Sequence, residues 1–182
     1  MLPAVQSNSP HLAILILLFV KSCTAGNSIV FVDSTIYAGS SSSITIGNDG
    51  LPVISYSGGG TQGDLIVVKC GNPSCSSGNI GSIVDSSDII HTSITIGTDG
   101  NPLVSYYEET NGNLRIAKCG NPTCSAGNTI LILDSFNDVG KFSSLTIGID
   151  GLPVISYLDS TNNDLKFFRC GSDRCLPYWT RR

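Results

Sequence analysis

Short hydrophobic runs alternate with polar turns along most of the chain, and the pattern recurs about every fifty residues. In its first period, apolar stretches at 43–46 and 53–56 flank the turn-forming Asn48-Asp49-Gly50. Further apolar stretches follow at 65–69 and 80–85. Short β-branched runs bounded by turn formers are typical of β-strands. The pattern therefore predicts four short strands in each period.

The period is written three times, and residues 43–52 return almost unchanged as 93–102 and 144–153. A repeat of this length marks an array of one supersecondary unit, because a single unit cannot bury its apolar face alone. In the second predicted strand, consecutive apolar residues such as Val53-Ile54 indicate a sheet that is packed on both faces. Four antiparallel strands per unit are typical of a β-propeller blade, whereas the coils of a β-solenoid, the alternative, are usually shorter.

We therefore predict an all-β protein, a β-propeller-type array of four-stranded antiparallel blades. The repeat count gives about three blades, which would form a partial propeller or half of an oligomeric ring. Complete propellers typically have four to eight blades. The segment 28–33 is similar to a fourth strand, so two chains could form a six-bladed ring in which each lends this strand to the other. A fragment of a longer gene product is the alternative.

Six of the seven cysteines form three equivalent pairs, each separated by four residues. The first two pairs enclose Gly-Asn-Pro, which favours a tight turn between antiparallel strands. Structural zinc, the alternative, usually takes cysteines two residues apart and needs two pairs at one ion. We therefore expect disulfides, each worth about 2 kcal/mol for a six-residue loop. The expected bridges are Cys70–Cys75, Cys119–Cys124 and Cys170–Cys175.

The Asp-Gly turn of each period could be interpreted as a cation site, but calcium needs six or more oxygen ligands. One aspartate per turn supplies too few, so we predict a structural role for both residues. The aspartate would bond backbone N–H groups within the turn, and the glycine would adopt positive φ. These structural turn residues are Asp49, Gly50, Asp99, Gly100, Asp150 and Gly151.

Residues 1–22 form a hydrophobic lead that is too short in its apolar part to span a bilayer. Its length suits a signal peptide or an N-terminal membrane anchor, although residues 1–10 lack Lys and Arg; a truncation end is the alternative. The repeat domain is expected to cover 23–175 and a tail 176–182. Cys23 matches a second cysteine of the repeat, but Leu18 stands where its partner should be. Regular disulfides predict an extracellular or periplasmic location.

The unit S-[IL]-T-I-G-x-D-G-x-P-[VL]-[IV]-S-Y, followed by [DN]-L-x-[VIF]-x-[KR]-C-G, resembles the repeat of secreted bacterial proteins with sialidase-like (BNR/Asp-box-related) β-propellers. The resemblance covers residues 23 to about 175 and implies a propeller. Many such propellers are non-catalytic modules. The Asp-box motif has a Trp after its turn, whereas each Asp-Gly turn of this chain is followed by Pro and not by Trp.

A sialidase-like mechanism would require a Tyr nucleophile assisted by Glu, an acid/base Asp and an arginine cluster. The repeated tyrosines Tyr56, Tyr106 and Tyr157 suit packing instead, because an active site usually breaks the symmetry of a repeat. The arginines Arg115, Arg169 and Arg174 form no repeated or convergent set. We therefore predict no catalytic, cofactor-binding or metal-binding residues.

A histidine, His91, and an acidic doublet, Glu108-Glu109, are also expected to be solvated and not catalytic. His91 is predicted to lie in a connection between repeats, without a catalytic partner. Glu108 and Glu109 would point to opposite faces of an extended segment. The net charge of −4 argues against nucleic acid as a partner.

The predicted function is that of a secreted, non-catalytic repeat module, a binding or scaffold β-propeller. A sialidase-like glycoside hydrolase or its inactive remnant is the alternative. Any glycan or protein ligand is expected at the variable, Asn/Thr/Gly-rich loops 57–63, 108–113 and 159–163. Self-association that completes a propeller is a further expected interaction.

Overall fold

The computed structural model describes residues 27–35, 37–59 and 63–176. The hydrophobic lead 1–22, Cys23 and the tail beyond Leu176 lie outside the described residues, so the predictions about them stay predictions. The chain divides into two compact units, Met1–Val30 and Phe31–Arg182, and the second contains every described strand. No helix among the described residues is long and apolar enough to cross a membrane.

The described strands form three antiparallel sheets, in each of which the strands are neighbours in chain order. We call these sheets blades 1, 2 and 3. Blade 1 contains β1 (Ser40–Ile46), β2 (Pro52–Gly58), β3 (Asp64–Lys69) and β4 (Ile80–Asp85). Blade 2 contains β5 (Ile89–Ile96), β6 (Pro102–Glu108), β7 (Asn113–Lys118) and β8 (Thr129–Asp134). Blade 3 contains β9 (Val139–Ile147), β10 (Pro153–Asp159) and β11 (Asp164–Arg169).

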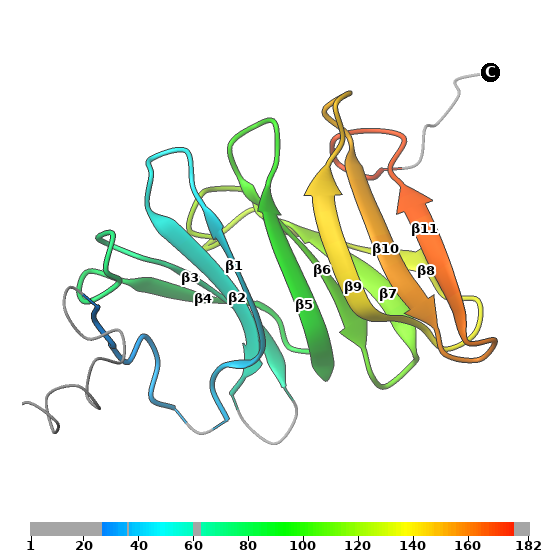
Figure 1. The fold of residues 1–182 in the computed structure, drawn as a ribbon, viewed down its shortest axis with the longest axis horizontal. Coiled ribbons are helices and arrows are strands. Elements are labelled where there is room, and N and C mark those ends of the chain that lie inside the picture. The colour runs from blue at the N-terminus through cyan, green and yellow to red at the C-terminus, as the bar shows by residue number, and fades with distance from the viewer. Residues whose placement is uncertain (1–26, 36, 60–62, 177–182) are drawn as a thin grey trace, which may run out of the picture. The chain divides into compact units, whose positions relative to one another are not determined.

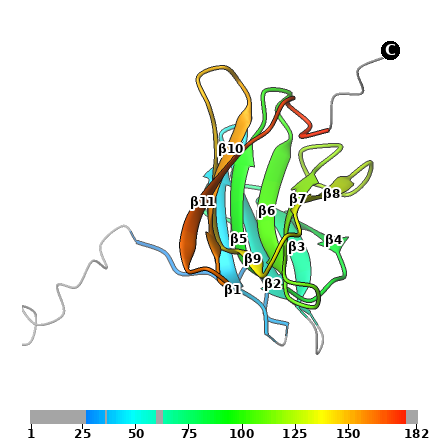
Figure 2. The same cartoon turned by 90° about the vertical axis from the view of Figure 1, so that its right-hand side faces the viewer.

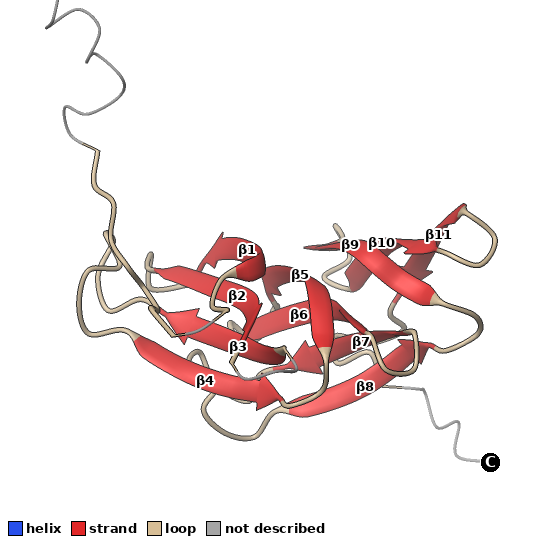
Figure 3. Cartoon of the chain, turned by 90° about the horizontal axis from the view of Figure 1, so that it is seen from below, coloured by secondary structure: helices blue, strands red, loops and turns tan. Residues whose placement is uncertain are grey.

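The blades follow one another in space as they do in the sequence. The first strands β1, β5 and β9 contact each other in succession and are the inner strands of the array. Viewed along the array, successive blades lie behind one another (Figure 2). Figure 3 shows β4 and β8 on the side away from the inner strands. The fold is thus all-β and of the β-propeller type, as the repeat predicts (Figure 1).

The predicted strands differ from the observed ones at two places. Each inner strand begins several residues earlier than the apolar pattern indicates, as in β1, because it contains a bulge. Residues 28–33, which resemble a fourth strand, form no strand. The reason is that a strand needs a paired neighbour, and within the described residues this segment pairs with none.

The hydrophobic cores lie between blades. Val53, Leu65 and Val67 of blade 1 pack against residues of blade 2 that include Ile94 and Val104. The interface between blades 2 and 3 repeats this arrangement with Leu103, Leu114, Ile116, Leu145 and Ile155. Because blade 2 buries one face on blade 1 and the other on blade 3, its strands are apolar at consecutive positions.

The repeated tyrosine links each blade to the strand before it. Tyr106 in β6 donates a hydrogen bond from its hydroxyl to Asp85 Oδ2, at the end of β4, over 2.7 Å. Tyr157 bonds Asp134 at the end of β8 over 2.8 Å. Tyr56 makes the same contact with Asp33, over 2.5 Å. Burial, together with the neighbouring carboxylate, raises the pKa of Tyr106, so this hydroxyl remains protonated and donates.

The opposite end of each blade carries a cystine and an ion pair. The structure contains the three predicted disulfides, with Cα atoms 4.7–4.8 Å apart. In the first turn Asp49 accepts a hydrogen bond from the backbone N–H of Leu51, and Gly50 has a φ of 78°. Asp49 also pairs with Lys69, 2.7 Å away. The pairs Asp99–Lys118 and Asp150–Arg169 repeat this contact.

Candidate binding site at the inner-strand bulges

Each inner strand carries a β-bulge at the same position of the repeat. Two residues of the inner strand stand opposite the single repeated tyrosine of the neighbouring strand, as His91 and Thr92 stand opposite Tyr106. The first residue of each bulge, which we call the bulge residue, has a left-handed backbone: Ser41 (φ 50°), His91 (56°) and Phe142 (54°). This conformation costs about 1–2 kcal/mol for a non-glycine residue, so the surrounding structure must enforce it.

Hydroxyl groups hold these bulges in place. The second bulge residue of blade 2, Thr92, donates a hydrogen bond to the carbonyl of Ser41, 2.7 Å away, and contacts Ser55 Oγ at 2.9 Å. Ser143 in blade 3 likewise donates to the carbonyl of His91 over 3.2 Å. The bulges of blades 2 and 3 are therefore each tied to the bulge of the preceding blade. The bulge backbone is repeated, whereas its first side chain differs in every blade.

Two bulge residues from different blades stack on one another. The ring centroids of His91 and Phe142 are 4.1 Å apart, with an angle of 45° between the rings. His91 is half-buried, but 66% of Phe142 is exposed. An exposed aromatic ring on a strained and enforced backbone suits contact with a ligand better than it suits packing.

A hydrogen-bonded cluster of polar groups adjoins the aromatic pair in the sequence. Lys141, directly before Phe142, donates a hydrogen bond to Asp138 Oδ2 over 2.6 Å, and its Nζ lies 4.9 Å from the centre of the Tyr107 ring. Tyr107 donates to the other oxygen of Asp138, also over 2.6 Å. These bonds from Lys141 and Tyr107 lower the pKa of Asp138, which is therefore a carboxylate at neutral pH.

The prediction that His91 lies in a connection between repeats is wrong, because His91 belongs to β5. The sequence does not show the start of β5, because the two bulge residues His91 and Thr92 are polar and interrupt the apolar pattern. Burial lowers the pKa of His91, and the positive charge of Lys141 lowers it further. His91 is consequently neutral at pH 7, and its imidazole can both donate and accept a hydrogen bond.

The variable loops lie at the same end of the blades as the bulges. Gly63, in the loop between β2 and β3, accepts a hydrogen bond from the N–H of Ile89, two residues before His91. Gly112 accepts the equivalent bond from Val139. A pocket of about 350 Å³ opens here, and its walls include Ser40 and Ile90, which directly precede two bulge residues. We call this end of the blades the loop end.

The acidic doublet at the end of β6 has one buried and one exposed side chain. Glu109 is exposed, as predicted, but Glu108 is buried, so the prediction that both are solvated is wrong for Glu108. Glu108 Oε2 lies 3.3 Å from Arg115 Nη2, and Arg115 Nη1 lies 3.3 Å from Asp85. This buried network compensates the carboxylate and fixes the tyrosine-bound Asp85. Arg115, on the third strand of blade 2, stands at the repeat position where blade 1 has the apolar Ile66.

The residues that a sialidase-like mechanism would need lie apart. The repeated tyrosines are buried and donate to aspartates between blades. Arg115 is engaged with Glu108 and Asp85. Arg169, by contrast, pairs with Asp150 at the cystine end of blade 3. In the part of the chain that the structure describes, no three His, Cys, Asp or Glu side chains gather as a metal site would require.

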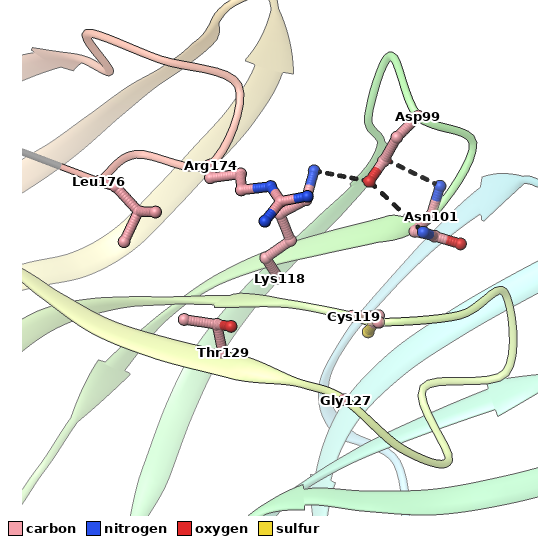
Figure 4. Close-up of a pocket in the computed structure, with 9 residues that line it drawn as sticks. Asp99, Asn101, Lys118, Cys119, Gly127, Thr129, Arg174 and Leu176 are labelled. Carbon is pink, nitrogen blue, oxygen red and sulfur yellow. Dashed lines mark hydrogen bonds and ion pairs between the residues drawn. The ribbon is translucent and has the colours of Figure 1, made fainter.

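A second pocket, of about 300 Å³, lies at the cystine end between blades 2 and 3 (Figure 4). Lys118 and Asp99 form an ion pair in its wall, with 2.9 Å between Nζ and Oδ2. Arg174, within the third cystine turn, and Leu176, just beyond it, complete the lining. The equivalent pocket between blades 1 and 2 is smaller, about 160 Å³, and its wall includes Pro122. The ion pair in both pockets belongs to the repeated scaffold.

Lowering the pH is expected to destabilise the fold. The hydrogen bond from Tyr56 lowers the pKa of Asp33, and those from Lys141 and Tyr107 lower that of Asp138. A carboxyl with a lowered folded-state pKa stabilises the fold above its unfolded pKa, and this stabilisation is lost as the pH falls through the folded pKa. The lowered pKa of His91 acts in the same direction below about pH 6.5.

Urea unfolding at pH 7, 5 and 3 measures this effect, and the midpoint is expected to fall at each step. The variant Asp138→Asn should lose less stability between pH 5 and 3 than the wild type, because it lacks one of the titrating groups. A midpoint that stays constant or rises on acidification would contradict these ionisation states.

No protein-family model matches the chain, and no curated protein sequence matches it significantly. Among solved structures, one described as an exo-1,5-α-L-arabinanase from a bovine ruminal metagenomic library is similar, with a TM-score of 0.43 and 14% sequence identity. The superposition covers 75% of this chain and 55% of that structure, so the chain spans about half of its length. At this level of similarity, the match does not assign an activity or a ligand.

Proposed function

We propose that the chain is a non-catalytic binding module and that its loop end binds a glycan across the bulge residues His91 and Phe142. The observation that carries this proposal is the exposed Phe142 ring on an enforced left-handed backbone. The apolar face of a sugar ring can stack on such an aromatic, while its hydroxyls need nearby donors and acceptors. Asp138, Lys141 and Tyr107, which are bonded to one another, carry such groups, and Lys141 directly precedes Phe142.

A binding role is favoured over hydrolysis because the side chains that a sialidase-like mechanism would use are engaged in contacts within the fold. The tyrosines that repeat are used between blades, and Arg115 is neutralised by two carboxylates. The three disulfides are consistent with an oxidising compartment, so we place the module outside the cytoplasm, in an extracellular or periplasmic location.

Replacing Phe142 with alanine is expected to weaken glycan binding at least about tenfold, which corresponds to about 1.4 kcal/mol. Binding of the full chain to an array of immobilised oligosaccharides would identify the preferred glycan, and calorimetric titration would give its affinity. Phe136→Ala is the matched control, because Phe136 is equally aromatic and exposed but lies in the connection before β9.

Four results would contradict the proposal. The wild-type chain could bind no oligosaccharide on the array, or the two phenylalanine variants could lose affinity equally. Turnover of a fluorogenic sialoside that is lost in Tyr107→Phe would instead establish a hydrolase. Binding to an immobilised protein without any glycan would replace the glycan with a protein ligand.

A further inference from the structure

Blade 3 exposes an apolar face that the other two blades bury. Leu165 and Phe167 on β11 are 83% and 67% exposed. Their equivalents on β3 and β7 are at most 1% exposed, because they pack against the next blade: Leu65, Val67, Leu114 and Ile116. We call the face formed by Leu165, Phe167 and Ser156 the trailing face.

Blade 1 exposes the complementary face. Ile44 on β1 is 62% exposed, whereas its equivalents Ile94 and Leu145 are almost fully buried against the preceding blade. Ile46, which follows on the same side of the strand, is also exposed. We call the face formed by Ile44, Ile46 and Ser42 the leading face. Among the described residues nothing covers either face.

The two exposed faces carry the same hydrogen-bonding groups that pair at the interface between blades 2 and 3. Between blades 2 and 3, Ser143 Oγ lies 2.9 Å from Ser105 Oγ, and the N–H of Leu145 donates to Ser93 Oγ over 3.0 Å. On the trailing face Ser156 and Ser144 occupy the positions of Ser105 and Ser93. On the leading face Ser42 and the N–H of Ile44 occupy the positions of their partners.

Residues 32 and 33 also lie against blade 1, at the place where the end of a preceding blade's fourth strand would dock. Val32 packs beside Tyr56 and Val68, and Asp33 accepts the hydrogen bond of Tyr56. Val84 and Asp85, at the end of β4, take the same places against blade 2. Residues 31–33 thus occupy the place of the outer strand of a preceding blade, and blade 3 has no such strand in the described chain.

We propose that a second copy of this chain covers both faces and that two copies close head to tail into a ring of six blades. The trailing face of each copy packs on the leading face of the other, and residues 28–33 pair with β11 of the partner as its fourth strand. Six blades lie within the range of four to eight that propellers use. Such a heterologous interface produces a closed ring only if the rotation between blades closes.

The mass of the purified full chain, measured by light scattering at micromolar concentration, is expected to be twice that of one chain. Leu165→Glu on the trailing face and Ile44→Glu on the leading face should each reduce the mass, with an unchanged far-ultraviolet circular dichroism spectrum. Both side chains are already exposed in a single copy, so the fold itself does not depend on them. Ile132→Glu, on the exposed side of β8, is the control and should stay dimeric.

Mixing the two interface variants separates head-to-tail packing from pairing of like faces. A mixture of Leu165→Glu and Ile44→Glu retains one intact interface and should form dimers that neither variant forms alone. A folded wild-type monomer, a mass above two copies, or a mixture that remains monomeric would overturn the proposal. This test is independent of glycan binding, which concerns the loop end.

Discussion

Replacing Tyr106 with alanine is expected to lower the free energy of unfolding by about 3–5 kcal/mol, the usual range for a large buried aromatic. Tyr106 is fully buried between blades 1 and 2, and its hydroxyl bonds Asp85 over 2.7 Å. The substitution would leave a cavity in the core and remove one of the donors that hold Asp85. Urea unfolding monitored by circular dichroism measures the loss.

Two further variants separate the contributions of ring and hydroxyl. Tyr106→Phe keeps the packing and should cost only about 1 kcal/mol, because Arg115 still pairs with Asp85. Tyr37→Ala removes a tyrosine that is 74% exposed and should change stability by no more than about 0.5 kcal/mol. If the Tyr106→Ala and Tyr37→Ala variants lost the same stability, Tyr106 would not be a link between blades.

Replacing Gly140 with alanine is expected to cost about 2–5 kcal/mol, because two unfavourable effects add. Gly140 has a φ of 112°, which side-chain-bearing residues rarely adopt. A Cβ at this position would also lie 2.7 Å from Leu114 Cα and 2.9 Å from Leu114 Cβ. Since β7 is fixed in the core of blade 2, the start of β9 would have to move.

Gly81→Ala is the matched control for this prediction. Its Cβ would lie 3.7 Å from Val68 Cγ2, an ordinary contact, so its stability should stay close to that of the wild type. Because Gly140 directly precedes Lys141, Gly140→Ala should weaken glycan binding as well. A Gly140→Ala variant as stable as Gly81→Ala would show that the start of β9 is not held against β7.

The strands and cystines could be predicted from the sequence because their signals are local and repeated. An apolar run between turn residues, or two cysteines around Gly-Asn-Pro, implies the same structure in any context. The ion pairs were missed, although a signal for them exists. A basic residue stands directly before the first cysteine of every pair, at Lys69, Lys118 and Arg169, and each meets the aspartate of the Asp-Gly turn.

The candidate binding site could not be predicted in the same way, because a bulge interrupts the alternation from which strands are recognised. At His91-Thr92 two polar residues stand opposite one tyrosine, so the apolar pattern begins only after them. One signal was available in the spacing. The second and third copies of Ser-[IL]-Thr-Ile are 51 residues apart, not 50, and the extra residue at the start of β9 is Gly140.

The repeated residues hold the blades together, whereas we propose that the bulge residues, which differ between blades, bind the ligand. The most direct test of this division is the Phe142→Ala variant, measured for both calorimetric glycan affinity and urea stability. The expected result is an affinity at least about tenfold lower, with a free energy of unfolding within about 0.5 kcal/mol of the wild type. A variant that loses stability by several kcal/mol, or that binds the glycan as tightly as the wild type, would contradict it.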